Sequence, residues 1–235
     1  PRYGRRAMQH IGIVACSAEG AALCYREICR LGHAAVGPHD HPRITIDSIP
    51  LARWMPAFDA GDDEALAAVM IESVEVVATA GADFAICPDN SAHVAWRYVE
   101  PASPVPWLHI ARVVGQAARD AGCRRVGVLG TRVTMGGTVY AEALGALGIE
   151  VVVPDADDAA EVDRIIFDEL VPGVVTAGAR RTYQAIIDRL GARGCDAVAL
   201  ACTEIPLLIG PADSSLPTLD STRLLAAAAL ERARR

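Results

Sequence analysis

Short apolar runs, rich in β-branched and small residues, recur along the chain, and a segment of helical length follows each one. The four clearest runs are residues 10–16 (HIGIVAC), 83–86 (DFAI), 125–131 (RVGVLGT) and 196–200 (DAVAL). This alternation is typical of the βα units of a parallel sheet. We expect the helices at residues 21–31, 62–80, 135–147, 159–170 and 180–193, an edge strand at 103–110, and a last strand and helix at 216–235.

The pattern also repeats within the chain. Gly127 lies 115 positions after Gly12, and Asp196 lies 113 positions after Asp83. A nearly constant offset indicates two similar halves. We therefore predict an α/β fold with two pseudo-symmetric lobes, each a mainly parallel sheet flanked by helices. The first lobe should comprise residues 8–110 plus 215–235, because the last helix is expected to return to it, and the second lobe residues 111–214. Residues 1–7, before Met8, are set aside as an extension.

The repeat places two reactive residues at equivalent positions. When residues 83–86 and 196–200 are aligned and extended without a gap, Asp89 falls opposite Cys202. Each follows the carboxyl end of a parallel strand, where open α/β sheets bind ligands. Inverting a carbon centre needs one group to remove a proton and another to return it from the opposite face. Alone, such an Asp is often a helix cap and such a Cys often core; their paired register favours a catalytic pair.

Polar residues beside this pair could hold an anionic substrate. Asn90, Ser91 and Thr203 follow the two strands at the expected starts of helices, and Ser17 follows the first strand. Hydroxyls and backbone N–H groups at helix N-termini bind carboxylates. We predict that the ligand is a small-molecule carboxylate.

Composition excludes several other kinds of ligand. The chain has 235 residues, 52% of them hydrophobic, and a formal net charge of -7. This balance provides an ample core but no basic surface for nucleic acid or an anionic membrane. No apolar run reaches the roughly 18 residues that span a bilayer, so we expect a cytoplasmic protein. The seven cysteines are scattered without metal-ligand spacing, which is typical of reduced thiols.

The chain contains no lysine, since all 22 of its Lys and Arg residues are Arg. A pyridoxal phosphate aldimine requires a lysine amine, so we predict chemistry without a cofactor. His39 and His41 could suggest a metal site. They lie in a turn rich in Pro and Gly with no evident third ligand, and we predict a solvated turn and no metal.

Several segments together resemble the Asp/Glu racemase superfamily, whose two motifs are Cys-Asn-Thr-x-His and Gly-Cys-Thr-Glu. The similarity covers nearly the whole chain and implies two flavodoxin-like lobes with the active site between them, no cofactor, a homodimer, and a thiol pair that exchanges an α-proton. It adds Thr131, Thr134 and Glu204 as candidate substrate-binding residues. The matching segments are residues 89–93 (DNSAH), 201–206 (ACTEIP), 130–135 (GTRVTM), 148–154 (GIEVVVP) and 217–222 (PTLDST).

The chain departs from this family pattern at important positions. Asp89 stands where the first motif has cysteine, and Cys87, two residues earlier, is predicted to pack in the core. Where the resemblance implies cationic partners for a distal carboxylate, Arg53 is one place out of register and Thr176 is neutral. A dicarboxylate would then be poorly held.

The leading hypothesis is an isomerase: a cofactor-independent racemase or epimerase of a small, aspartate- or glutamate-like amino acid or a related carboxylate. We expect helix N-termini to lower the pKa of Cys202, and burial could raise that of Asp89. His93 is expected to support the loop and His109 to belong to the core. The alternatives are a one-thiol decarboxylase or cis–trans isomerase of a small carboxylic acid, and an inactive ligand-binding relative.

Overall fold

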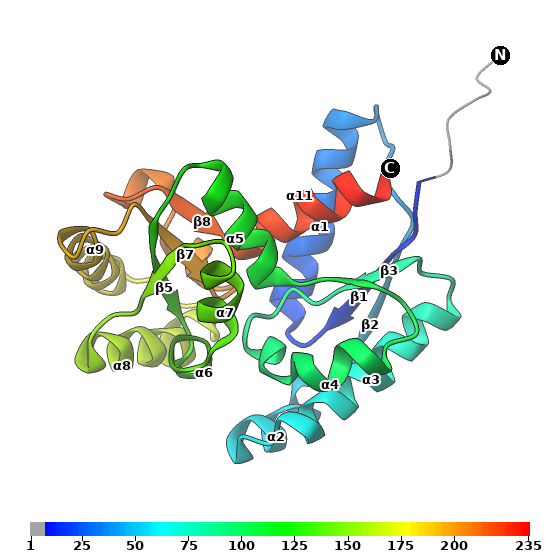
Figure 1. Cartoon of the computed structure of the whole chain (residues 1–235), viewed down its shortest axis with the longest axis horizontal. Helices are drawn as coiled ribbons and strands as arrows, with labels where there is room; N and C mark the ends of the chain where they lie inside the picture. Colours follow the sequence, from blue (N-terminus) through cyan, green and yellow to red (C-terminus); the bar gives the residue numbers. More distant parts are fainter. Residues whose placement is uncertain (1–7) are drawn as a thin grey trace.

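The computed structural model describes residues 8–235 and contains two four-stranded sheets in which every pairing is parallel (Figure 1). The strand order is β2-β1-β3-β4 in the first sheet and β6-β5-β7-β8 in the second. The two orders are equivalent, which confirms the predicted two-lobed α/β fold. Residues 1–7, set aside above, lie outside the described chain. The strands are β1 (Ile11–Ala15), β2 (Ile44–Ser48), β3 (Phe84–Ile86), β4 (Trp107–Leu108), β5 (Arg125–Gly130), β6 (Glu150–Val152), β7 (Ala197–Ala201) and β8 (Thr218–Asp220).

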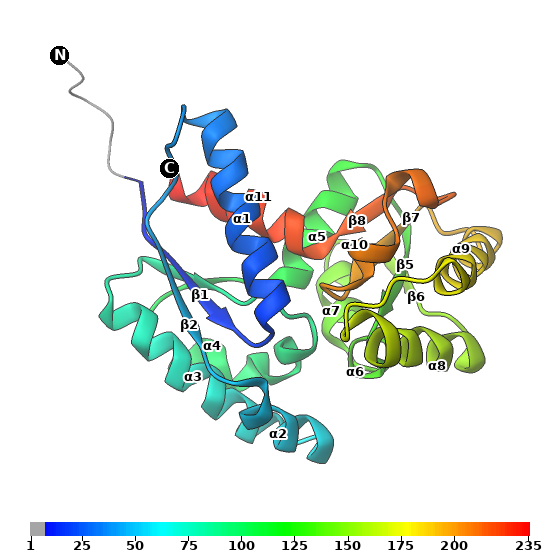
Figure 2. The ribbon, with the colours of Figure 1, turned by 180° about the vertical axis from the view of Figure 1, so that it is seen from behind.

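Helices connect these strands and cover both faces of each sheet (Figures 1 and 2). The α-helices are α1 (Ala18–Ala35), α2 (Met55–Ala60), α3 (Asp63–Thr79), α4 (Trp96–Ala102), α5 (Ile110–Asp120), α6 (Arg132–Gly136), α7 (Val139–Gly145), α8 (Ala156–Ile165), α9 (Ala177–Ala192), α10 (Ile205–Leu208) and α11 (Ser221–Ala233). The shorter helical elements are the 3₁₀ helices η1 (Leu51–Arg53), η2 (Ser91–Ala95) and η4 (Pro211–Asp213) and the π-helix η3 (Ile166–Leu170). Within residues 8–235, no helix is long and apolar enough to cross a membrane.

The structure corrects two predicted helices. The segment expected at residues 135–147 is divided between α6 and α7, and the backbone at Gly137, between them, is extended. The segment expected at 159–170 begins earlier and changes to π-helical geometry at Ile166. The runs predicted from the sequence do not include strands β2 and β6, which lie at the edges of the sheets and are only partly buried.

The glycines that revealed the repeat have the same structural role in both lobes. A Cβ atom on Gly12 of β1 would lie 2.6 Å from Cγ2 of Val77 on α3. A Cβ atom on Gly127 of β5 would lie 2.8 Å from Cδ1 of Leu190 on α9. In each lobe, a helix therefore packs directly on the strand at the point where the side chain is missing.

The end of the chain belongs to both lobes. Strand β8 pairs with β7 in the second sheet, with Thr218 beside Val198. Helix α11 then runs back along α1, and Leu225 and Ala229 share the apolar core of the first lobe with Ile11 (Figure 2). The range 215–235 was assigned to the first lobe as a whole; its helix packs there, whereas its strand extends the second sheet. The chain thus crosses between the lobes at Asp220 and Ser221, next to the cavity described below.

Candidate active site

A cavity of about 450 Å³ lies between the lobes, beyond the carboxyl ends of β1, β3, β5 and β7. Both predicted catalytic residues, Asp89 and Cys202, line it. Of the predicted substrate-binding residues, Ser17, Asn90, Ser91, Thr131, Thr203 and Glu204 also line it, but Thr134 does not. The cavity therefore brings together almost all of the residues selected from the repeat and from the family resemblance.

On the second lobe, Cys202 is paired with a carboxylate. Cys202 follows the last residue of β7, and its thiol lies 3.0 Å from Oε2 of Glu204, to which it donates. The hydroxyl of Thr203 donates to the same oxygen at 2.6 Å. Burial, and then the charge of Glu204, raise the pKa of the Cys202 thiol well above its usual range. The predicted lowering of this pKa is wrong, because α10 has only four residues and desolvation outweighs its dipole.

On the first lobe, Asp89 is buried at the turn after β3. Oδ1 of Asp89 accepts the backbone N–H of Ala92 at 2.9 Å, and the thiol of Cys16 forms a side-chain hydrogen bond with the Asp89 carboxyl. Burial raises the pKa of Asp89, in the direction considered from the sequence. Cys16 also lines the cavity. In the sequence it stands only as the end of an apolar run. Like Cys202 after β7, it directly follows a strand, β1.

Asn90 fixes the loop that carries Asp89 to both lobes. Its Nδ2 donates to Oγ of Ser221 at 3.0 Å, and its Oδ1 accepts the hydroxyl of Tyr140 at 2.7 Å. The Ser221 hydroxyl donates in turn to the carbonyl of Leu200 on β7 at 2.9 Å. Asn90 and Ser221 are buried, so these bonds replace water. The predicted substrate contact of Asn90 is therefore combined with a structural role.

The hydroxyl-bearing residues form a second link between the lobes. Oγ of Ser91 lies 2.8 Å from Oγ1 of Thr131 and 3.2 Å from Oγ1 of Thr134. Thr131 caps α6, and Ser17 caps α1 by accepting the backbone N–H of Gly20 at 3.2 Å. Thr134, predicted to bind substrate, is buried behind Ser91 and Thr131 because it lies one turn into α6.

His93 supports the loop that carries Asp89, His109 caps α5, and neither ring carries a charge. Nδ1 of His93 donates to the carbonyl oxygen of Asp89 at 2.7 Å, and its Nε2 accepts the backbone N–H of Ile110 at 3.4 Å. Burial lowers the pKa of His93 to about 4 and that of His109 to about 2, so both rings are neutral at pH 7. Cys87 is fully buried in the core of the first lobe, as predicted.

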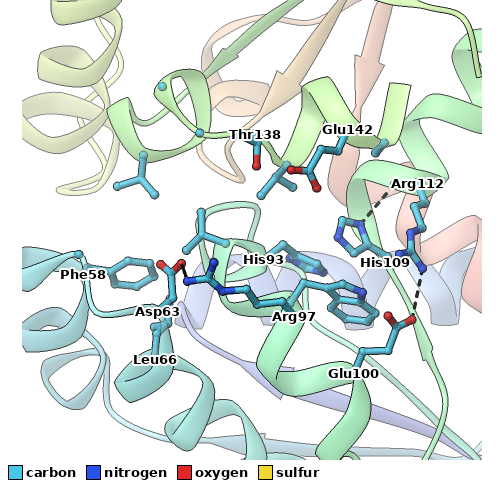
Figure 3. A pocket seen from close by; sticks show the side chains of 18 of the residues that line it. Phe58, Asp63, Leu66, His93, Arg97, Glu100, His109, Arg112, Thr138 and Glu142 are labelled. Carbon is cyan, nitrogen blue, oxygen red and sulfur yellow. Dashed lines mark hydrogen bonds and ion pairs between the residues drawn. The ribbon is translucent and has the colours of Figure 1, made fainter. Parts of the chain in front are cut away.

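A larger cleft of about 1030 Å³ adjoins this cavity and shares Phe58, Arg132 and Val133 with it (Figure 3). Four of its charged side chains are engaged in pairs: Arg97 lies 3.3 Å from Asp63, and Arg112 lies 3.4 Å from Glu100. Among the described residues, no cysteine lines this cleft. The groups suited to proton transfer at carbon are gathered in the smaller cavity.

The residues considered as partners of a distal carboxylate lie elsewhere. Arg53 forms a two-bond ion pair with Glu72 at 2.9 Å, and Thr176 caps α9 and donates to Glu169. Neither lines the cavity. In the part of the chain that the structure describes, no three His, Cys, Asp or Glu side chains are placed to hold a metal ion.

Two lobes, each built on a parallel sheet, with a thiol and carboxyl groups in the cavity between them, define the class of protein. The chain belongs to the Asp/Glu/Hydantoin racemase family, whose sequence model matches residues 11–229. It is 26% identical over 201 residues to the broad specificity amino-acid racemase RacX of Bacillus subtilis (strain 168), covering 85% of this chain and 86% of that protein.

Solved structures agree with this family. A candidate Asp/Glu racemase from Yersinia pestis superposes with a TM-score of 0.90 at 31% identity, over 97% of this chain and 100% of that chain. An aspartate racemase homologue from Pyrococcus horikoshii OT3 superposes with a TM-score of 0.85 at 27% identity, over the same shares of the two chains. A glutamate racemase from Francisella tularensis, crystallised with D-glutamate, shares the fold with a TM-score of 0.69 at 14% identity, over 95% of this chain and 80% of that chain.

Proposed function

We propose that this protein is a cofactor-independent amino-acid racemase or epimerase, which inverts the α-carbon by proton transfer in the cavity between the lobes. The observation that carries the proposal is the presence of Asp89 from one lobe and Cys202 from the other in the same 450 Å³ cavity. Family membership supports the reaction type. The absence of lysine from the chain supports a mechanism without pyridoxal phosphate.

The two sides of the cavity supply a proton acceptor and a proton donor. Cys202 can lose its proton to Glu204, 3.0 Å away, as its sulfur takes the proton from the α-carbon. On the first lobe, burial raises the pKa of Asp89, so that this carboxyl can hold a proton for return to the other face. The hydroxyls of Ser17 and Ser91, which line the cavity, would bind the substrate carboxylate, whose charge delocalisation stabilises the carbanion.

The rest of the cavity suits an uncharged side chain. Its wall is largely apolar, and of its charged residues only Arg132 is a cation, whereas Asp59 and Asp163 are acidic. The side-chain carboxylate of aspartate or glutamate would lose its water in this cavity without gaining a dedicated cationic partner, and this desolvation is costly in a partly apolar site. We therefore infer that apolar amino acids are better substrates than aspartate or glutamate. The apolar wall includes Leu51, Met55, Phe58, Val133, Ile166, Phe167 and Val171.

The test is racemisation of single enantiomers of methionine, leucine, phenylalanine, aspartate and glutamate, followed by chiral chromatography and by loss of the Cα–H signal in deuterated water. We expect kcat/KM for the apolar amino acids to exceed that for aspartate by at least about tenfold, which corresponds to about 1.4 kcal/mol. Faster turnover of aspartate would contradict the proposed substrate class but not the reaction.

Strand β7 offers a matched pair of variants. Cys202 follows the strand and Cys195 precedes it, and both are buried. Cys202→Ser should lower kcat/KM by about 10³-fold or more, whereas Cys195→Ser should leave it within about threefold. Turnover that survives Cys202→Ser would refute the mechanism. Release of carbon dioxide would instead support a one-thiol decarboxylase, and ligand binding without any turnover an inactive relative.

A further inference from the structure

The cavity contains a second thiol whose surroundings mirror those of Cys202. Cys16 follows the last residue of β1, is 4% exposed and lines the cavity, and its thiol is hydrogen-bonded to the carboxyl of Asp89. Across the cavity, the thiol of Cys202, 9% exposed, is hydrogen-bonded to Glu204. Each lobe therefore contributes one thiol and one carboxyl group, and in each lobe the thiol follows a strand directly.

We propose that Cys16 is the proton carrier of the first lobe, and that Asp89 acts as a positioning residue which supplies and accepts the proton of its sulfur. The proposal rests on the proposed racemase function. It changes one step of that function, in which Asp89 itself returns the proton to the α-carbon, as was also expected from the sequence. The juxtaposition that carries it is a thiol and a carboxyl, from strands β1 and β3, at the wall of the same cavity as Cys202.

The surroundings of Asp89 favour this division of roles. One carboxyl oxygen of Asp89 accepts the backbone N–H of Ala92, and the carboxyl also forms a hydrogen bond with the thiol of Cys16. These hydrogen bonds fix the carboxyl against the protein. A thiol is also better matched than a carboxylate to a weakly acidic carbon, because its ordinary pKa is about 8.5 and that of Asp about 3.9. Cys87 is not an alternative, since it is fully buried and does not line the cavity.

The proton balance closes with the four groups present. At the start, Cys16, Asp89 and Cys202 are protonated and Glu204 is ionised. The Cys202 proton moves to Glu204 as its sulfur takes the α-proton, and the electron pair of the broken C–H bond passes into the substrate carboxylate. The Cys16 proton then bonds to the α-carbon on the opposite face, and Asp89 reprotonates the Cys16 sulfur. One proton has moved from the first lobe to the second, and the reverse reaction returns it.

A substrate with a leaving group separates the two faces experimentally. β-Chloroalanine loses its α-proton to one sulfur and then chloride, which yields 2-aminoacrylate without any need for the second proton carrier. The variants Cys16→Ala, Cys16→Ser and Cys202→Ala are assayed for chloride release from each enantiomer separately, and for racemisation of the best amino acid found above. The control is Cys87→Ala, which removes a buried sulfur near Asp89 that lies outside the cavity.

Both Cys16 variants should lose racemisation by about 10³-fold. They should retain chloride release from one enantiomer within about threefold and lose it from the other by about 100-fold. Cys202→Ala should show the opposite enantiomer preference, and Cys87→Ala should match the wild type. Opposite enantiomer preferences in the two variants cannot arise from partial unfolding, because unfolding would reduce chloride release from both enantiomers equally. Near-ultraviolet circular dichroism checks the fold of each variant.

Asp89→Asn tests the positioning role. It should lower racemisation by about 10–100-fold, and reaction on the Cys16 face should then rise with pH as the sulfur loses its proton to solvent. If Cys16→Ala and Cys16→Ser both keep racemisation within threefold while Asp89→Asn abolishes it, the carrier is Asp89 and the proposal is overturned. If the wild type neither racemises any amino acid nor releases chloride, the proposed function itself fails.

Discussion

Gly20 lies where three loops of the cavity meet, so a single methyl group there should disturb the site as a whole. Gly20 belongs to the first turn of α1. A Cβ atom at this position would lie 2.8 Å from the carbonyl oxygen of Pro88, from Oγ of Ser17 and from Cγ2 of Thr203. Pro88 and Thr203 directly adjoin Asp89 and Cys202. The methyl group added by Gly20→Ala would therefore displace the loops that carry Asp89 and Cys202.

The expected magnitude follows from two opposing effects. Overpacking in a closely packed region costs about 1–3 kcal/mol. Alanine gains at most about 1 kcal/mol over glycine in a helix, and less in its first turn. The free energy of unfolding should fall by about 1–2 kcal/mol, which lowers the Tm by about 2–8 °C for a chain of this size. A displacement of several tenths of an ångström at reacting groups should lower kcat/KM by about 10–100-fold.

The control for this variant is Gly145→Ala, because Gly145 ends α7 and no atom lies within 4 Å of its added Cβ. We expect the control to leave activity unchanged and the Tm equal or slightly higher. Thermal unfolding and the racemisation assay are run on both variants. Wild-type Tm and activity in Gly20→Ala would refute the close approach of the three loops.

Three further predictions concern the buried polar groups of the site. Tyr140→Phe removes the hydroxyl that donates to Oδ1 of Asn90 at 2.7 Å and should lower the free energy of unfolding in urea by about 1–3 kcal/mol; an unchanged midpoint would contradict the role of this bond. Burial raises the pKa of Asp89 above its usual 3.8. The free energy of unfolding that the neutral carboxyl contributes is therefore fully present below the usual pKa, and it is lost as the pH rises through the pKa of the folded state. Asp89→Asn should therefore stabilise the protein relative to wild type more at pH 8 than at pH 4, and an equal difference at both would contradict the burial. Because burial and Glu204 raise the pKa of Cys202, its alkylation by iodoacetamide, followed by peptide mass spectrometry, should still accelerate above pH 9; a plateau near pH 7 would indicate a thiolate.

The two-lobed fold could be predicted because its determinants are local or repeated. The β-branched runs of β1, β3, β5 and β7 are short and buried, and each is visible in the sequence without knowledge of its partners. The repeat supplied the long-range information, since Gly12 and Gly127 each accommodate a helix packed on a strand. The same register paired Asp89 with Cys202, and both line one cavity.

The chemistry of that cavity depends on contacts between distant parts of the chain. Asn90 is bonded to Ser221, 131 positions away, and Cys16 reaches Asp89 only because β1 and β3 are neighbours in the sheet. The direction expected for the pKa of Cys202 was wrong, because a helix N-terminus is a neighbour in sequence whereas desolvation comes from the core of the second lobe packed around the thiol. Hydrophobic order along the chain is thus sufficient for the architecture, but protonation states follow from burial, which exists only once distant segments of the chain are packed together.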